Sequence, residues 1–201
     1  ASNNTALGRL ALFANTTGID NTAIGSGALD ANTTANENVA VGKDALTDNT
    51  TGYANTAVGR MALGNNTTAI GNTGLGTDAL FTNTTGASNT AVGRLALFAN
   101  TTGNHNVAVG TNALDANTTG IQNTAVGSLC LSTFDGNYNT AVGYGAMENT
   151  TNGNHNVAVG KTALNANTTG YFNNAVGSNT LTVNTTGNQN NAFGYAVLNA
   201  N

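Results

Sequence analysis

Hydrophobic and polar positions follow each other along this chain in a pattern that repeats every 17 residues. The stretch from Asn106 to Gln122, NVAVGTNALDANTTGIQ, shows the unit: an apolar segment closed by glycine, an alanine–leucine pair and an N-T-T-G sequence. Twelve copies follow one another, and one step, between Gly127 and Gly143, is 16 residues long. A fixed repeat of this length predicts a solenoid, in which each copy forms one coil that stacks on the next.

We number the places of the repeat from its first asparagine. Places two to four are rich in β-branched residues and predict a short strand, which ends at the glycine that occupies place five in every copy. Places seven to eleven predict a second strand centred on the alanine–leucine pair, and N-T-T-G predicts the turn that closes the coil. We therefore expect an all-β fold, a β-solenoid or parallel β-roll of twelve 17-residue coils with two short strands per coil.

Stacking in register places each side chain above its copy in the next coil. We expect the first-place asparagines to form a structural ladder of hydrogen bonds along the rod. These residues are Asn4, Asn21, Asn38, Asn55, Asn72, Asn89, Asn106, Asn123, Asn139, Asn156, Asn173 and Asn190.

The N-T-T sequence of the turn forms a second column. It begins at Asn15, Asn32, Asn49, Asn66, Asn83, Asn100, Asn117, Asn149, Asn167 and Asn184. N-T-T matches the acceptor pattern for N-glycosylation, but asparagine is also a preferred turn residue. The sequence leaves both alternatives open: a ladder of glycans, or a ladder of turn asparagines.

The position of the core depends on which side chains point inward, since neighbours on a strand point to opposite faces. If Ala108 and Ala113 line a narrow interior, Val109 and Leu114 point outward, and several rods must associate laterally to bury them. If Val109 and Leu114 fill the interior, a single rod suffices. The small apolar content of each coil favours lateral association.

The chain forms one repeat array over residues 1–201, with an irregular coil at residues 131–139. There the segment from Ser132 to Gly136 replaces the usual turn, and one residue is lost. Two interpretations remain open: a bulge that re-aims the surface, or neutral drift in a loop. We expect the array to be a segment of a longer repetitive protein.

Composition argues against several classes of function. Charged residues make up 7% of the chain and the net charge is -4, so we expect no nucleic-acid partner. No apolar run is long enough to span a membrane, so we expect no membrane insertion in this segment. The single cysteine, Cys130, replaces a repeat alanine and is expected to be a small buried side chain.

Residues able to carry chemistry are few and scattered. His105 and His155 share the last place of the repeat and are expected at the surface, too far apart for one metal ion. The five cations directly follow the place-five glycine and are expected along one exposed edge: Arg9, Lys43, Arg60, Arg94 and Lys161. The chain contains no common catalytic motif, so we expect no enzyme, no catalytic or metal site and no cofactor.

The segments 38–42, 106–110 and 156–160, each N-V-A-V-G and each followed at the third place by alanine, resemble the head repeats of trimeric autotransporter adhesins. The resemblance implies a trimer of left-handed parallel β-rolls that binds host surfaces. The family's repeat is shorter and lacks this regular N-T-T-G turn. Similar repeats occur in phage tail fibres and other surface fibres.

These observations predict a non-enzymatic, fibre-forming structural protein, a surface adhesin or filament component. We expect it to be extracellular, on a cell surface or on a virion. Its expected partners are further copies of itself, as a homotrimer or an end-to-end filament, and candidate glycans. The alternative is a module that binds ice or glycans through a stacked Thr/Asn face, or a segment of a phage tail fibre.

Overall fold

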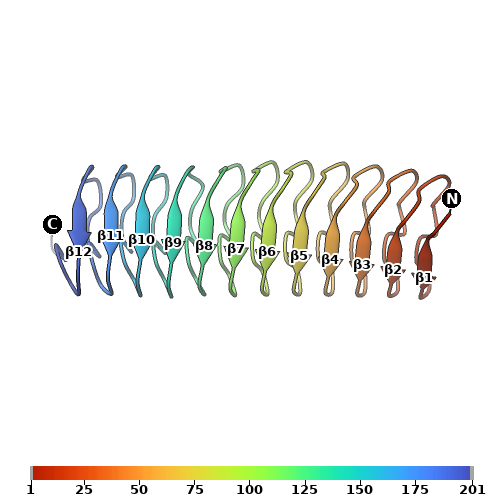
Figure 1. The fold of residues 1–201 in the computed structure, drawn as a ribbon, viewed down its shortest axis with the longest axis horizontal. Helices are drawn as coiled ribbons and strands as arrows, with labels where there is room; N and C mark the ends of the chain where they lie inside the picture. The colour runs from red at the N-terminus through yellow and green to blue at the C-terminus, as the bar shows by residue number, and fades with distance from the viewer. Residues whose placement is uncertain (1, 200–201) are drawn as a thin grey trace.

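The computed structural model describes residues 2–199, and within them the chain forms a β-solenoid that contains no helix. Figure 1 shows a rod in which the coils lie side by side in chain order, with the two termini at opposite ends. Residues 1, 200 and 201 of the predicted array lie outside the described residues. The predicted all-β solenoid with a repeat of about 17 residues is confirmed.

Each coil contributes one strand of three residues, and the strands form a single 12-stranded sheet in chain order. The strands are β1 (Thr5–Leu7), β2 (Thr22–Ile24), β3 (Val39–Val41), β4 (Thr56–Val58), β5 (Thr73–Leu75), β6 (Thr90–Val92), β7 (Val107–Val109), β8 (Thr124–Val126), β9 (Thr140–Val142), β10 (Val157–Val159), β11 (Asn174–Val176) and β12 (Asn191–Phe193). They occupy places two to four of the repeat, as the sequence predicts.

All neighbouring strands pair in parallel and in register. Between β7 and β8, Ala108 lies beside Ala125 and Val109 beside Val126. The register continues through the shorter step, because Val126 of β8 pairs with Val142 of β9. Parallel strands lie about 4.7–4.9 Å apart, so twelve coils make a rod about 55 Å long.

The second strand that we expected around the alanine–leucine pair is not formed in residues 2–199, where this segment is a series of turns. The cause is the backbone, which is left-handed at place seven and at place nine in all twelve copies; at place nine φ lies between 49° and 54°. This conformation costs about 1–2 kcal/mol for a residue with a side chain. Full burial of a leucine contributes about 1.5–3 kcal/mol, so burial outweighs the strain.

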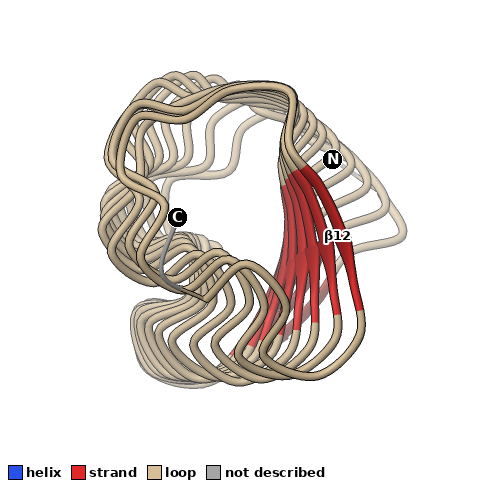
Figure 2. Cartoon of the chain, turned by 90° about the vertical axis from the view of Figure 1, so that its left-hand side faces the viewer, coloured by secondary structure: helices blue, strands red, loops and turns tan. Residues whose placement is uncertain are grey.

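The left-handed leucine also decides which side chains fill the interior. Ala108, Ala113 and Leu114 are all fully buried, whereas Val109 is half-buried on the outer side of the sheet. Neither predicted arrangement is therefore correct as a whole. Ala113 and Leu114 both point inward, because they do not alternate as strand neighbours would. Viewed along the rod, all strands lie on one side of the coil (Figure 2).

Glycine at place five is required by both conformation and space. Gly110 has φ 138°, and a Cβ there would lie 2.5 Å from the carbonyl oxygen of Gly127 in the next coil. All twelve copies have φ between 121° and 140°. Each strand ends directly before this glycine, as the sequence predicts, and the positive φ is the reason.

The inner and outer columns predict different responses to a larger side chain. Ala108→Leu should lower the free energy of unfolding by at least about 1–3 kcal/mol, because it overpacks a filled interior. Val109→Leu should change it little, because Leu7 and Leu75 occupy the same place in other coils. Urea unfolding followed by circular dichroism measures both, and equal losses would contradict this assignment of columns.

Candidate functional site: the strand face and the asparagine ladders

The outward side chains of the sheet come from two places of the repeat, and we call these two columns the strand face. Place two contributes Thr5, Thr22, Val39, Thr56, Thr73, Thr90, Val107, Thr124, Thr140, Val157, Asn174 and Asn191. Place four contributes Leu7, Ile24, Val41, Val58, Leu75, Val92, Val109, Val126, Val142, Val159, Val176 and Phe193. No member of either column is charged.

The apolar column of the strand face remains in contact with solvent along the whole rod. Each side chain is partly covered by its copies in the adjacent coils, so most members are half-buried. Leu75 and Val126 nevertheless keep 45% and 36% of their surface exposed, and Leu7 and Phe193 keep 67% and 71%. The strand face is thus a regular, uncharged and partly apolar surface that repeats once per coil.

The first-place asparagines form the predicted ladder inside the coil wall. The backbone N–H of Asn106 donates to Oδ1 of Asn89 at 2.9 Å, and Nδ2 of Asn106 donates to the same oxygen at 3.2 Å. Nδ2 also donates to the carbonyl oxygen of Gly120 in its own coil at 2.8 Å. One buried carboxamide therefore joins two coils and closes the turn of its own coil.

The asparagines of the N-T-T turns form a second ladder, most of which is buried. Nδ2 of Asn100 donates to Oδ1 of Asn83 at 2.8 Å and to the carbonyl oxygen of Gly103 at 3.1 Å. Asn117 donates in turn to Oδ1 of Asn100 at 2.9 Å. Nδ2 is the atom that a glycan would occupy, and here both of its hydrogens are already bonded. This geometry favours the turn-ladder alternative; among the ten, Asn149 is exposed.

The threonines of the turn differ in how their hydroxyl groups are used. Oγ1 of Thr101 donates to the carbonyl oxygen of Thr118 in the next coil at 3.0 Å, and the bond recurs where a regular turn is followed by another regular turn. The following threonine, such as Thr102, is exposed. Because the ladder asparagines and the first threonine bond within the rod, only one threonine per turn is left to face solvent.

The second ladder is interrupted where the sequence is irregular. Phe134 is fully buried in place of the asparagine expected after Asn117, and Thr150 is buried in the following coil. Oδ1 of Asn117 and Oγ1 of Thr150 are both buried without a hydrogen-bond partner in residues 2–199. An unpaired buried polar group costs about 1–3 kcal/mol. The irregular coil thus exchanges ladder bonds for the burial of one aromatic ring.

The carboxylate of Asp135 replaces the threonine carbonyl that accepts hydrogen bonds from the preceding turn in regular coils. In regular coils the turn N–H groups donate to a threonine carbonyl of the next coil. Here Oδ1 of Asp135 accepts from the N–H groups of Thr118, Thr119 and Gly120 at 2.9, 2.7 and 2.9 Å. Burial raises the pKa of Asp135, but hydrogen bonds from the Thr118 hydroxyl and from these N–H groups outweigh it and hold the pKa below its ordinary value.

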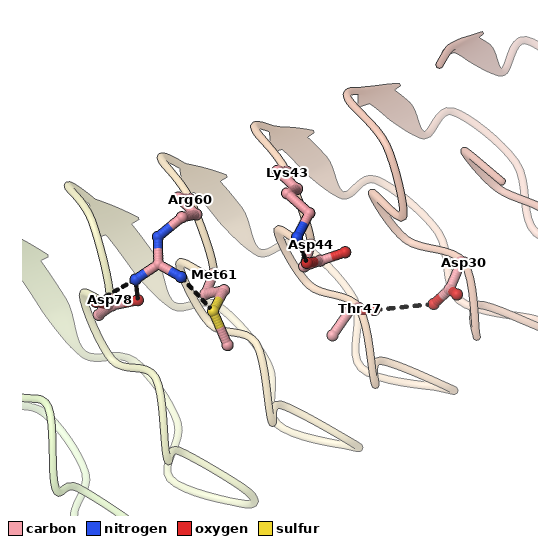
Figure 3. Close-up of polar contacts among 7 residues, drawn as sticks. All are labelled: Asp30, Lys43, Asp44, Thr47, Arg60, Met61 and Asp78. Atoms are coloured by element: carbon pink, nitrogen blue, oxygen red, sulfur yellow. Dashed lines mark hydrogen bonds and ion pairs between the residues drawn. The ribbon is translucent and has the colours of Figure 1, made fainter. Parts of the chain in front are cut away.

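The five cations lie on an exposed edge, as predicted. Arg60 forms a two-pronged ion pair with Asp78 of the next coil, with Nη2–oxygen distances of 2.9 and 3.1 Å, and Lys43 pairs with the adjacent Asp44 at 3.2 Å (Figure 3). Exposed pairs of this kind contribute about 0–1 kcal/mol. The edge is a solvated border of the rod.

An aromatic stack on the outside of the rod was not predicted. The ring of His155 lies between those of Tyr138 and Phe172, with centroid distances of 4.8 and 4.9 Å. All three occupy the last place of successive repeats, so aligning that column would have revealed the stack. His105, at the same place elsewhere, is exposed like His155, which confirms the predicted surface position of both histidines.

Cys130 is fully buried, as predicted, and burial raises the pKa of its thiol to about 12. At neutral pH the side chain is therefore a thiol, which is a weak nucleophile and a poor metal ligand. No group of three or more His, Cys, Asp or Glu side chains that could hold a metal ion, and no pocket, is found in residues 2–199.

Within the described part of the chain, no helix is long and apolar enough to cross a membrane. Comparison of the chain with protein-family models, with curated proteins and with solved structures finds no match.

The second ladder predicts a large difference between two asparagines of the same sequence motif. Asn100→Leu removes the partners of Asn83, Gly103 and Asn117, and at about 1–3 kcal/mol for each buried unpaired group the loss should be several kcal/mol. Asn149→Leu changes an exposed side chain and should cost less than about 1 kcal/mol. Thermal unfolding measures both, and similar losses would show that the ladder contributes little.

Asp135 predicts a dependence of stability on pH with a defined sign. Its folded pKa is lowered, so its stabilisation is complete above the unfolded pKa of about 3.9 and is lost as the pH falls through the folded pKa. Asp135→Asn should therefore destabilise the rod at pH 7, and the difference from the wild type should shrink below about pH 4.

The difference between the two proteins is the quantity to measure, by urea unfolding at a series of pH values. Desolvation by burial raises the pKa of Asp115, whose contribution to stability changes with pH in the opposite direction. Asp115 is present in both proteins and cancels in the difference. A difference that stays constant from neutral to acid pH would contradict the role of the Asp135 carboxylate.

Proposed function

We infer that this chain is a non-enzymatic structural rod within an extracellular fibre, a surface adhesin or a filament, and that it associates laterally through the strand face. The observation that carries this proposal is the unbroken strand face, with an uncharged apolar side chain on each of its twelve strands. Isolated apolar residues are normal on a protein surface, whereas a continuous apolar stripe marks an interaction site.

The use of polar groups supports a structural role. In each regular coil the asparagine carboxamides bond to the coil before or after, or to the turn of their own coil. These groups hold neighbouring coils at a fixed distance, which is what a fibre requires along its length. Their donors are occupied by this task, and a substrate would have to compete with it.

The repeated geometry makes a second copy of the chain a suitable partner for the strand face. A copy has the same spacing between coils, so contacts made by one coil can recur in every other. If association buried about 20 Å² of additional apolar surface per coil, each coil would contribute about 0.5 kcal/mol and twelve coils about 6 kcal/mol. The face carries no charge that would lose its hydration on contact.

The number of associated rods and the biological setting rest on the resemblance to trimeric adhesin heads. We propose a homotrimer on that basis, displayed on a cell or virion surface, with end-to-end joining of rods as a further mode of assembly. An adhesin displays its rod to a binding partner, whereas a filament uses it as a spacer. Both roles require the same extended and stable array.

Substitutions on and off the strand face test lateral association. The wild-type chain should sediment as a trimer, and Val109→Asp with Val126→Asp should yield monomers, because each association would then bury unpaired carboxylates. Thr102→Asp, on an exposed turn away from the face, serves as the control and should leave the trimer intact. Circular dichroism must show the same β-structure in all three. A folded wild-type monomer, or a trimer that survives the strand-face substitutions, would refute the proposal.

A further inference from the structure

The coil that starts at Asn139 differs from the others in the residue that precedes the turn glycine. In regular turns this residue is threonine, but here the N-T-T sequence is shifted by one place, so that Asn152 precedes Gly153. This is the one asparagine–glycine pair in the sequence. Glycine has no side chain to shield its amide nitrogen from the carboxamide of the residue before it.

The environment of Asn152 differs from that of the ladder asparagines. Asn152 is exposed, and its backbone N–H is held by the carbonyl oxygen of Thr168 at 2.8 Å. Neither its side-chain carboxamide nor the N–H of Gly153 has a hydrogen-bond partner in residues 2–199. In contrast, a ladder asparagine such as Asn100 is buried, has both amide hydrogens bonded and is followed by a β-branched threonine.

We propose that Asn152 is a site of spontaneous covalent modification, in which its side-chain amide is converted to a carboxylic acid. The amide nitrogen of Gly153 attacks Cγ of Asn152 and forms a C–N bond. The bond from Cγ to Nδ2 breaks, and Nδ2 leaves as ammonia with the proton from the Gly153 nitrogen. The product is a five-membered cyclic imide within the main chain.

Water then opens the imide at either of its two carbonyl carbons. Opening at one carbon gives aspartate, and opening at the other gives isoaspartate, in which the main chain runs through the former side-chain carbon. Water is the only co-reactant, and no atom changes its oxidation state. The net charge of the chain changes by one, from -4 to -4 - 1 = -5.

The new carboxylate is formed in the coil that stacks on the irregular coil, whose Asp135 caps the turn at residues 118–120 in the coil before it. The backbone N–H of Asp135 donates to the carbonyl oxygen of Thr151 at 3.2 Å, so the two segments are in direct contact. Like charges at close range repel each other and favour protonation of one of them. Because the two segments are joined by this backbone hydrogen bond, we expect conversion of Asn152 to weaken the hydrogen bonds that Asp135 accepts from residues 118–120.

Peptide mapping by mass spectrometry of the full chain, aged in mildly alkaline buffer, tests the site. Asn152 should convert several-fold faster than any other asparagine, with both aspartate and isoaspartate at residue 152. The variant Asn152→Thr restores the threonine–glycine sequence of the regular turns and should lose this early conversion alone. The proposal is overturned if another asparagine reacts first, or if the variant gains acid at the wild-type rate.

Hydrogen exchange tests the effect on the cap. After identical ageing, the backbone amides of Thr118, Thr119 and Gly120 should exchange several-fold faster in the wild type than in Asn152→Thr. Freshly prepared samples of the two proteins should exchange alike. Equal exchange after ageing, in material shown to be converted at Asn152, would overturn the coupling to the Asp135 cap.

Discussion

A buried carboxamide must find partners for two donors and one acceptor, and in the regular part of this rod the ladder asparagines find them in their own coil and in the coils directly before and after it. Asn106 shows the arrangement: it donates to Asn89 in one neighbouring coil, closes the turn at Gly120, and accepts from Asn123 in the other neighbour. The arrangement works only if the next coil places the same residue at the same position. This requirement connects the length of the repeat, the strand register and the positions of the turns.

The hydrophobic interior has a smaller part in this structure than in most globular folds. It consists mainly of alanine columns and one leucine column, the latter held in a left-handed backbone conformation. The interior is filled by small side chains, so the coil is narrow and the larger valine column lies on the outside. Because alanine fills the interior, the larger apolar side chains of place four lie on the outside of the coil. They form the apolar column of the strand face.

Much of the fold could be predicted from the sequence because the repeat determines which residues stack. The first strand of each coil, the place-five glycine, the asparagine ladder of place one and the irregular coil follow from the alignment of copies. The second predicted strand was wrong because leucine rarely adopts a left-handed backbone, and residue type alone does not indicate it. For the N-T-T asparagines the sequence alone does not distinguish a ladder from a glycan acceptor. Their burial and the bonded hydrogens of Nδ2 in the structure favour the ladder.

Contacts between different columns were harder to predict than contacts within one. The carboxylate of Asp135 replaces a backbone carbonyl of the regular turn, and this substitution has no counterpart in the other copies to align with. The stack of Tyr138, His155 and Phe172 lies within one column, but its three residues differ in type, so no repeated residue marks it in the sequence. A position-by-position comparison of all columns would have identified the stack.

The second asparagine ladder has a gap at Phe134 and Thr150, and the coupling between neighbouring coils is weaker at this gap. A solenoid behaves approximately as a one-dimensional chain of units, each coupled only to its nearest neighbours. Where the coupling between two units is weaker, cooperative unfolding stops most easily, so the gap is the place in the array where a boundary between folding blocks costs least. The place-one ladder and the sheet still cross this place, so the coils on its two sides remain coupled through them.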